Sequence, residues 1–130
     1  MKYLESFDLF GPGEYEKITR GNFHDITSKM KYEGVNEPER VRFERLFKKI
    51  LNPANKDLDW PKVEIYKTDS SDYYYTSIDQ DKIIFIFHYE DDWYFIEYYN
   101  QNSMDSHYYK CDGIDGVEKM LRENFSKFTK

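Results

Sequence analysis

The sequence predicts an α+β domain in which two helices precede an antiparallel sheet of four to five strands and a third helix follows it. Apolar residues recur at helical spacing up to about residue 52 and again after residue 112. Between residues 63 and 111 the period changes to two, and tyrosine, isoleucine and phenylalanine dominate, as is typical of strands. A chain of 130 residues is long enough for one core and short for two, so we expect a single domain, 1–130.

The first helix is expected to begin after Thr19, whose side chain can cap it, and to end at Gly34. Its apolar stripe is Phe23, Ile26 and Met30. The residues before the Gly-Pro-Gly turn at 11–13 are expected to form a short strand or arm.

The second helix has the clearer boundaries. Asn36 can cap it, Glu39 three residues later completes a capping-box pattern, and Asn52-Pro53 ends it. Its apolar stripe follows the i, i+3, i+4, i+7 spacing of a helix lying on another layer. The stripe is Phe43, Leu46, Phe47 and Ile50.

Five runs of residues are expected to form the strands: 63–67, 73–78, 83–89, 93–100 and 107–111. Short polar links join them, as in antiparallel hairpins. The tightest links carry acids, at 79–81 and 90–92. Because successive turns of a meander lie at opposite ends of the sheet, we expect these acids at both ends rather than in one pocket.

The last helix is expected to open near Asp112, with Glu118 and Arg122 paired across one turn. Its apolar face is Ile114, Val117, Leu121 and Phe125. With three amphipathic helices and one sheet, we expect all three helices on one sheet face, which leaves the other face to water or to a partner.

The two faces of the sheet follow from alternation. In the fourth run the side chains of Trp93, Phe95, Glu97 and Tyr99 share one side, and Glu97 marks that side as the solvent face. In the third run both sides are apolar, which indicates a central strand that is covered on both faces. Tyrosine tolerates half-wet surfaces and is enriched in binding surfaces, although it is also simply a good strand former.

Acidic charge is concentrated in the same region. Residues 69–106 hold nine acids and one base, Lys82, within a chain of net charge −6. This balance repels phosphate and excludes duplex DNA as a direct ligand of that face, and it favours a protein with a basic surface. The expected partner-binding residues are Tyr73, Tyr75, Asp79, Asp81, Glu90, Asp91, Asp92, Trp93, Phe95, Glu97 and Tyr99.

Motifs for catalysis are lacking. The glycines at 11 and 13 lack the spacing and the lysine of a phosphate-binding loop, and the acids have no calcium-loop spacing. We therefore predict no catalytic residue, cofactor or metal. The alternative is an enzyme or small-ligand-binding domain with a cleft near His88 and His107, if these meet across neighbouring strands. Cys111 is expected to be a small core residue.

The single cysteine cannot form an internal disulfide, which is compatible with a reducing compartment, so we expect a cytoplasmic protein. No stretch approaches the 18 apolar residues of a membrane helix, and we expect no membrane partner.

The strings MKYLESFDLF, EYEKIT, DDWYFIEYY and YYKCDGIDGVEKML resemble small, acidic, tyrosine-rich accessory proteins of bacteriophages. This resemblance carries no catalytic residue. It implies a protein that acts in the host cytoplasm by binding and blocking a host protein, such as a nucleic-acid-handling or defence protein, in the manner of an anti-CRISPR protein or a nucleic-acid mimic. A third hypothesis is a structural protein in which a second copy of the chain covers the aromatic face.

Overall fold

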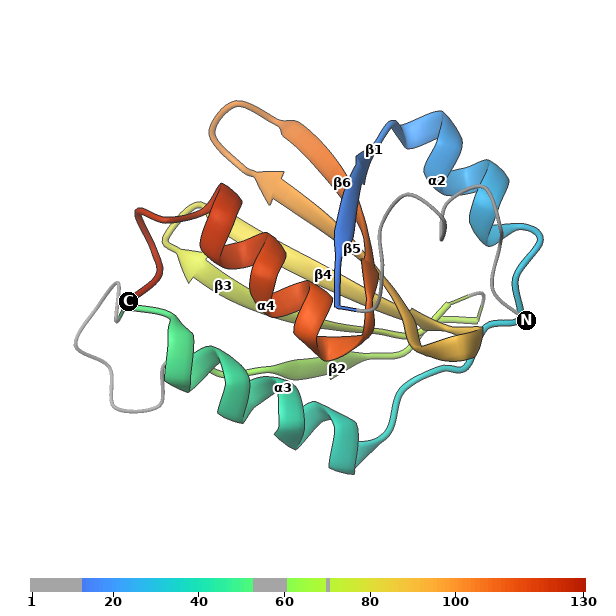
Figure 1. Ribbon diagram of the computed structural model, residues 1–130, viewed down its shortest axis with the longest axis horizontal. Helices are drawn as coiled ribbons and strands as arrows, with labels where there is room; N and C mark the ends of the chain where they lie inside the picture. Colours follow the sequence, from blue (N-terminus) through green and yellow to red (C-terminus); the bar gives the residue numbers. More distant parts are fainter. Residues whose placement is uncertain (1–12, 53–60, 70) are drawn as a thin grey trace.

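The computed structural model describes residues 13–52, 61–69 and 71–130 (Figure 1). Its sheet has six antiparallel strands in the order β1-β6-β5-β4-β3-β2. The strands are β1 (Tyr15–Ile18), β2 (Glu64–Tyr66), β3 (Tyr73–Asp79), β4 (Lys82–Tyr89), β5 (Trp93–Asn100) and β6 (Asp105–Asp112). The helices are α2 (Arg20–Thr27), α3 (Glu37–Ile50), the 3-10 turn η1 (Glu90–Asp92) and α4 (Gly113–Asn124).

The α+β class and the order of two helices, sheet and helix are confirmed, but the sheet has six strands instead of four to five. The additional strand is β1, which pairs with β6 at the edge of the sheet. Only four residues long, with Glu16 and Lys17 exposed, it carries too little apolar pattern to be recognised locally. Its pairing depends on a partner about 90 residues away. The strand or arm expected before residue 13 lies outside the described residues.

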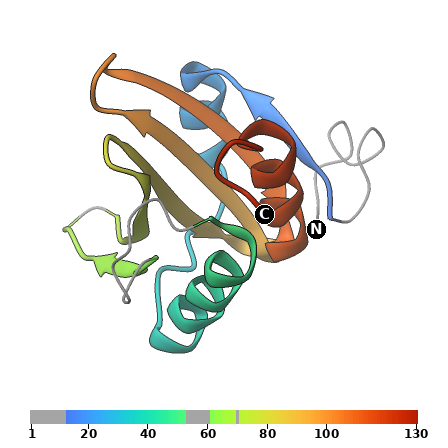
Figure 2. The same cartoon turned by 90° about the vertical axis from the view of Figure 1, so that its left-hand side faces the viewer.

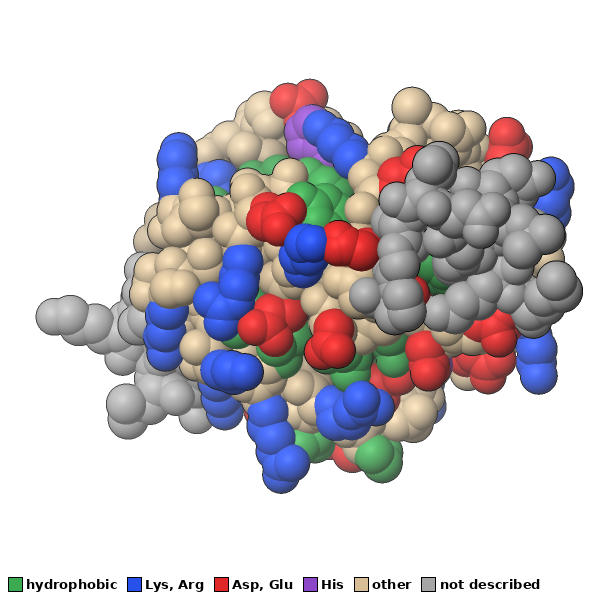
Figure 3. Space-filling view, in the orientation of Figure 1, with side chains coloured by type: hydrophobic (Ala, Val, Ile, Leu, Met, Phe, Trp, Pro, Cys, Tyr) green, Lys and Arg blue, Asp and Glu red, His purple; other side chains and the backbone are tan. Residues whose placement is uncertain are grey.

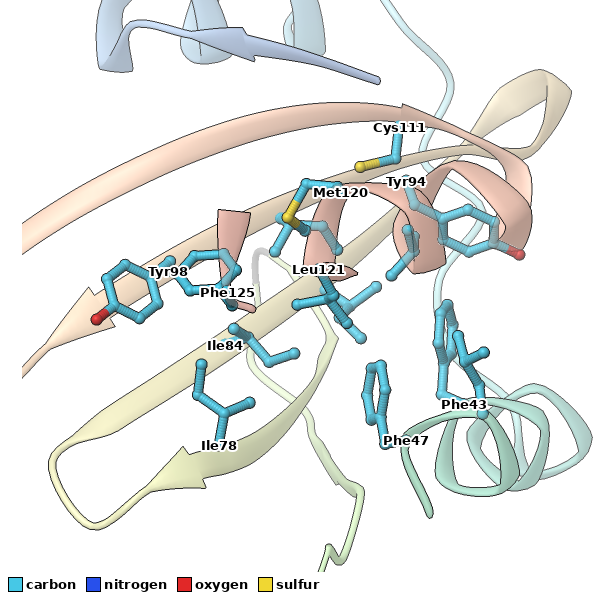
Figure 4. Packing of buried hydrophobic residues seen from close by; sticks show 14 of the residues in the cluster. Phe43, Phe47, Ile78, Ile84, Tyr94, Tyr98, Cys111, Met120, Leu121 and Phe125 are labelled. Atoms are coloured by element: carbon cyan, nitrogen blue, oxygen red, sulfur yellow. The ribbon is translucent and has the colours of Figure 1, made fainter. Parts of the chain in front are cut away.

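The larger core lies between the sheet and the helices α3 and α4. Phe43 and Phe47 of α3 and Leu121 of α4 point toward the sheet, where they meet side chains such as Ile84 and Tyr94 (Figure 4). Met120 and Cys111 are also fully buried in this core. The helical spacing of the apolar residues in α3 and α4 therefore turns the apolar side of each helix toward the sheet.

The helix α2 lies on the opposite face of the sheet, so the expectation that all three helices share one face is wrong (Figure 2). The ring of Phe23 lies 5.7 Å from the rings of Phe87 and Phe95 and 5.0 Å from that of Tyr108. Met30 is buried in the same smaller core. Because α2 follows β1 directly, it lies near the β1 edge of the sheet, where it packs on the apolar residues of the second face.

The link from α2 to α3 passes around the end of the sheet from one face to the other. Tyr32 forms a β-bridge with Tyr89, and the Glu33 amide donates to the His88 carbonyl at 3.0 Å. The Glu90 amide donates in turn to the Lys31 carbonyl at 2.9 Å. These bonds place the first turn of α3 beside the end of β4, which positions Glu39.

Candidate functional site

The part of the second sheet face formed by β2, β3 and β4 carries a group of aromatic side chains, here called the aromatic patch, whose margin at Phe87 contacts Phe23 of α2. Its members are Tyr66 of β2, Tyr73 and Tyr75 of β3, and Phe85 and Phe87 of β4. Tyr66 is 50% exposed and the other four are half-buried. A group of five partly exposed rings is an unusual feature for a surface that only water covers.

The rings of the aromatic patch contact one another around Tyr73. The Tyr66 ring stacks on that of Tyr73 with 5.3 Å between ring centres. The Phe85 ring meets Tyr73 edge to face at 5.4 Å, and the Phe87 ring is tilted against it at 5.3 Å. Tyr75 is 6.3 Å away. These separations are those of favourable aromatic pairs, so the patch has a defined shape before any partner binds.

Two carboxylates flank the aromatic patch. Glu64 lies opposite Tyr75 on β2 and accepts a hydrogen bond from its hydroxyl at 2.5 Å. Glu97 lies opposite Phe85 on β5 and accepts from the Ser106 hydroxyl at 3.0 Å. The pKa of Tyr75 is raised, first by its bond to Glu64, which keeps this ring neutral. The patch is therefore an apolar strip between two carboxylates, of which Glu64 also pairs with Lys62 at 3.6 Å.

Trp93 and Phe95 share the sheet face of Glu97, as alternation predicted, but both are fully buried. Helix α2 covers them, with Phe23 against Phe95, so the expectation that these two rings contact a partner from an open face is wrong. Tyr99 lies farther along the same strand and is half-buried.

The predicted acids lie at both ends of the sheet. Asp79 pairs with Lys82 at 3.3 Å, and the Asn102 side chain donates to Asp81 at 2.8 Å, both beside the turn between β3 and β4. Glu90, Asp91 and Asp92 form the turn η1 at the other end. Asp91 and Asp92 both have left-handed backbone, with φ of 59° and 57°. Left-handed backbone is costly for non-glycine residues, so this turn is held by its surroundings.

A buried polar network lies behind η1, on the face that α3 and α4 cover. Glu39 of α3 is 6% exposed and accepts hydrogen bonds from the hydroxyls of Tyr74 and Tyr94 at 2.5 and 2.6 Å. His88 lies between two carboxylates, with Nδ1 3.1 Å from Glu39 and Nε2 3.1 Å from Asp92. Four separate elements, α3, β3, β4 and β5, thus meet at one carboxylate, and η1 is joined to it through His88.

The network shifts the titration of its members. Burial alone would raise the pKa of Glu39, but hydrogen bonds from His88, Tyr74 and Tyr94 outweigh it and hold that pKa below its ordinary value. Burial would lower the pKa of His88, yet the contacts with Glu39 and Asp92 raise it. Burial and the Glu39 carboxylate raise the pKa of both tyrosines strongly. The fold therefore favours the pair formed by an ionised Glu39 and a protonated His88.

His88 and His107 do not meet, so the expectation that they come together across neighbouring strands is wrong. Strand β5 separates β4 from β6, and His88 lies opposite Tyr94 whereas His107 lies opposite Tyr98, four residues along β5.

Cys111 is fully buried, which confirms its place in the core, and burial raises the pKa of its thiol. In the described ranges no three acidic, histidine or cysteine side chains converge to hold a metal ion.

A hollow of about 470 Å³ lies beside η1. Its lining includes Arg42 and the four carboxylates Asp91, Asp92, Asp112 and Asp115. The charged residues of the face with α3 and α4 are otherwise mixed, with many Lys and Arg side chains around α3 (Figure 3). This distribution contrasts with the aromatic patch and its two flanking acids on the opposite face.

Several of these residues could not be predicted from the sequence. Glu39 had an explanation as a capping-box residue, and nothing local marks it as the centre of a network. Phe85 and Phe87 lie in a strand whose two sides are equally apolar, so alternation could not say which side is partly open. Tyr66 offered a signal, since it is a strand-end tyrosine in the acidic, tyrosine-rich half that holds the predicted binding residues.

No family model matches the chain, and neither a curated protein nor a solved structure is significantly similar to it. Within the described part of the chain, no helix has the length and apolar character needed to cross a bilayer.

Proposed function

We propose that this chain is a non-enzymatic protein-binding module that engages a partner through the aromatic patch. The observation that carries the proposal is the group of five partly exposed rings on β2, β3 and β4, in which four rings contact the central Tyr73. Tyrosine-rich surfaces supply large contact area at small entropic cost, and they dominate binding energy in protein interfaces.

The acids suggest the charge of the partner. Glu64 and Glu97 flank the patch, and acidic turns lie at both ends of the sheet. Such a surface attracts a basic protein and speeds its association, and it disfavours direct contact with nucleic acid. A basic groove that normally holds nucleic acid fits this description. Together with the resemblance to phage accessory proteins, this supports a phage-encoded inhibitor of a host nucleic-acid-handling or defence protein.

The proposal is tested by capture from nuclease-treated bacterial lysate, at low and at high salt, with the purified protein as bait. Two variants form a matched pair. Tyr66→Ala removes the most exposed ring of the patch, whereas Met104→Ala truncates a 75% exposed side chain in the turn between β5 and β6.

We expect a stoichiometric partner that wild type and Met104→Ala retain, that Tyr66→Ala loses by about tenfold or more in affinity, and that high salt releases. Equal capture by both variants would place the interface elsewhere. A purified partner with nuclease or DNA-binding activity then permits the direct test, in which stoichiometric addition of this protein should inhibit that activity.

A further inference from the structure

The aromatic patch contains one row of side chains that runs straight across four strands. Glu64 lies opposite Tyr75, Tyr75 opposite Phe85, and Phe85 opposite Glu97. Neighbouring strands are about 4.8 Å apart, so the backbone positions of Glu64 and Glu97 lie roughly 14 Å apart, with two aromatic residues between them. A ligand for this row needs positive charge at its edge and apolar or flat groups over its centre.

Glu97 is the better placed of the two carboxylates to bind such a ligand. It is half-buried on an aromatic floor, and the Ser106 hydroxyl fixes its orientation. A carboxylate can accept about four hydrogen bonds, so the hydroxyls of Ser106 and Tyr108 leave acceptor capacity toward the patch. Beside burial, the charge of Glu97 contributes to the raised pKa of both Tyr73 and Tyr108. Those two rings therefore stay neutral near neutral pH.

We propose that the aromatic patch recognises an arginine side chain of its partner, which stacks on the ring of Phe85 and donates hydrogen bonds to Glu97 directly opposite. The Tyr73 ring stands at 83° to that of Phe85 and forms a wall beside the guanidinium. This inference rests on the proposed function, because it names the group through which the partner binds. Arginine suits the row better than lysine, since its guanidinium is planar, stacks on aromatic rings, pairs with a carboxylate through two donors and is weakly hydrated.

The test uses small probes, so that it does not depend on knowing the partner. N-acetyl-arginine methylamide is titrated into isotope-labelled protein, and chemical-shift changes are followed by NMR. The lysine analogue has the positive charge but no planar guanidinium, and the citrulline analogue has a planar group of similar shape but no charge. We expect saturable shifts at Tyr73, Phe85 and Glu97, with binding about threefold weaker for lysine and weaker still for citrulline.

Two variants with the same net charge isolate the position of the carboxylate. Glu97→Gln removes the charge at the patch and can still accept from Ser106, so the fold should be retained. Asp105→Asn removes a charge from an exposed residue whose side chain alternates onto the opposite face. We expect Glu97→Gln to weaken the arginine probe about threefold and Asp105→Asn to leave it unchanged.

Two results would overturn the inference. Equal weakening by both variants would mean that the probe responds to net charge alone. Shifts at the same residues on raising the protein concentration without probe would assign the patch to a second copy of the chain.

The arginine subsite and the proposed function can also fail separately. If the probe binds as expected but Tyr66→Ala leaves lysate capture intact, the arginine subsite stands and the proposed function fails. If capture depends on Tyr66 but not on Glu97, the proposed function stands and the arginine subsite fails.

Discussion

Gly116 marks the closest approach between α4 and the backbone that leads into β1. A Cβ atom added there would stand 2.5 Å from the Glu14 carbonyl oxygen, which also accepts a hydrogen bond from the Asp112 amide at 2.9 Å and therefore cannot move aside easily. We predict that Gly116→Ala destabilises the protein by about 1–2 kcal/mol, because overpacking outweighs the better helix propensity of alanine. The measurement is the free energy of unfolding in urea.

Gly21 in α2 provides the matched control. A Cβ atom there would meet the Thr19 hydroxyl at 4.0 Å, which is an ordinary contact. Gly21→Ala should therefore be neutral or stabilising by up to about 1 kcal/mol. If the two alanine variants changed the free energy of unfolding alike, the close packing at Gly116 would not explain the choice of glycine.

The pair Glu39 and His88 gives the stability a predictable pH dependence. The pKa of His88 is raised in the folded state. Its contribution to the free energy of unfolding is therefore complete below the unfolded pKa of about 6.5, and it is lost as the pH rises through the folded pKa. The pKa of Glu39 is lowered, so its contribution is present above about 4.5 and is lost as the pH falls through the folded value. Both contributions are complete between about pH 4.5 and 6.5.

His88→Gln tests this prediction. The difference in free energy of unfolding between wild type and variant should be largest near pH 6, and it should shrink as the pH rises above about 6.5 through the raised pKa of folded His88. Urea unfolding at half-unit steps of pH measures it. A difference that is constant over this range would show that His88 is neutral in the fold and that it stabilises only by packing on Tyr94, whose ring stacks on it at 4.6 Å.

At the scale of elements, α3 depends on its first turn. The Asn36 side chain accepts a hydrogen bond from the Glu39 amide at 2.8 Å, and the Asn36 amide donates to the Tyr74 hydroxyl at 3.0 Å. Asn36→Ala should cost about 1 kcal/mol, since it removes the cap but keeps the backbone bond. Asn36→Ser should recover most of that loss in thermal or urea unfolding, and failure to do so would point to a role other than capping.

The same turn shows how far the sequence predicts this element. The cap at Asn36 and the buried stripe from Phe43 to Ile50 are confirmed, because both depend on local spacing. The capping box is only half confirmed: the Glu39 amide bonds Asn36, but the Glu39 side chain turns to Tyr74, Tyr94 and His88. Those partners come from three strands that lie far along the chain, and no local pattern announces them.

Local sequence patterns could not predict which face of the sheet each helix covers. The strand from Trp93 to Asn100 was predicted with its exact bounds, and its alternation sorted the residues correctly into two faces. Alternation cannot say what covers a face. The burial of Trp93 and Phe95 depends on where β1 delivers α2, and the pairing of β1 is non-local. Of the candidate site, Tyr73, Tyr75 and Glu97 lie at the patch, whereas these two rings lie under the helix.

At the scale of the whole molecule, the two cores cover the central strands of the sheet more completely than its edge strands. Strand β5 is paired along all eight residues with β4 on one side and β6 on the other. The large core buries Tyr94 and Ile96 on one face, and α2 buries Trp93 and Phe95 on the other. The edge strands β1 and β2 have four and three residues. Structure that is covered on both faces opens only when the whole fold opens.

In native-state hydrogen exchange, the rate of amide exchange should therefore increase from the centre of the sheet to its edges. We predict that the amides of β5 exchange slowest, at the free energy of global unfolding, and that those of β1 and β2 exchange fastest among the strands, through local opening. The aromatic patch straddles this gradient, since Phe85 lies on an inner strand and Tyr66 on an edge strand. Binding of a partner to the patch should consequently slow exchange in β2 far more than in β5. Unchanged exchange in β2 on saturation with a partner would show that binding leaves this edge free.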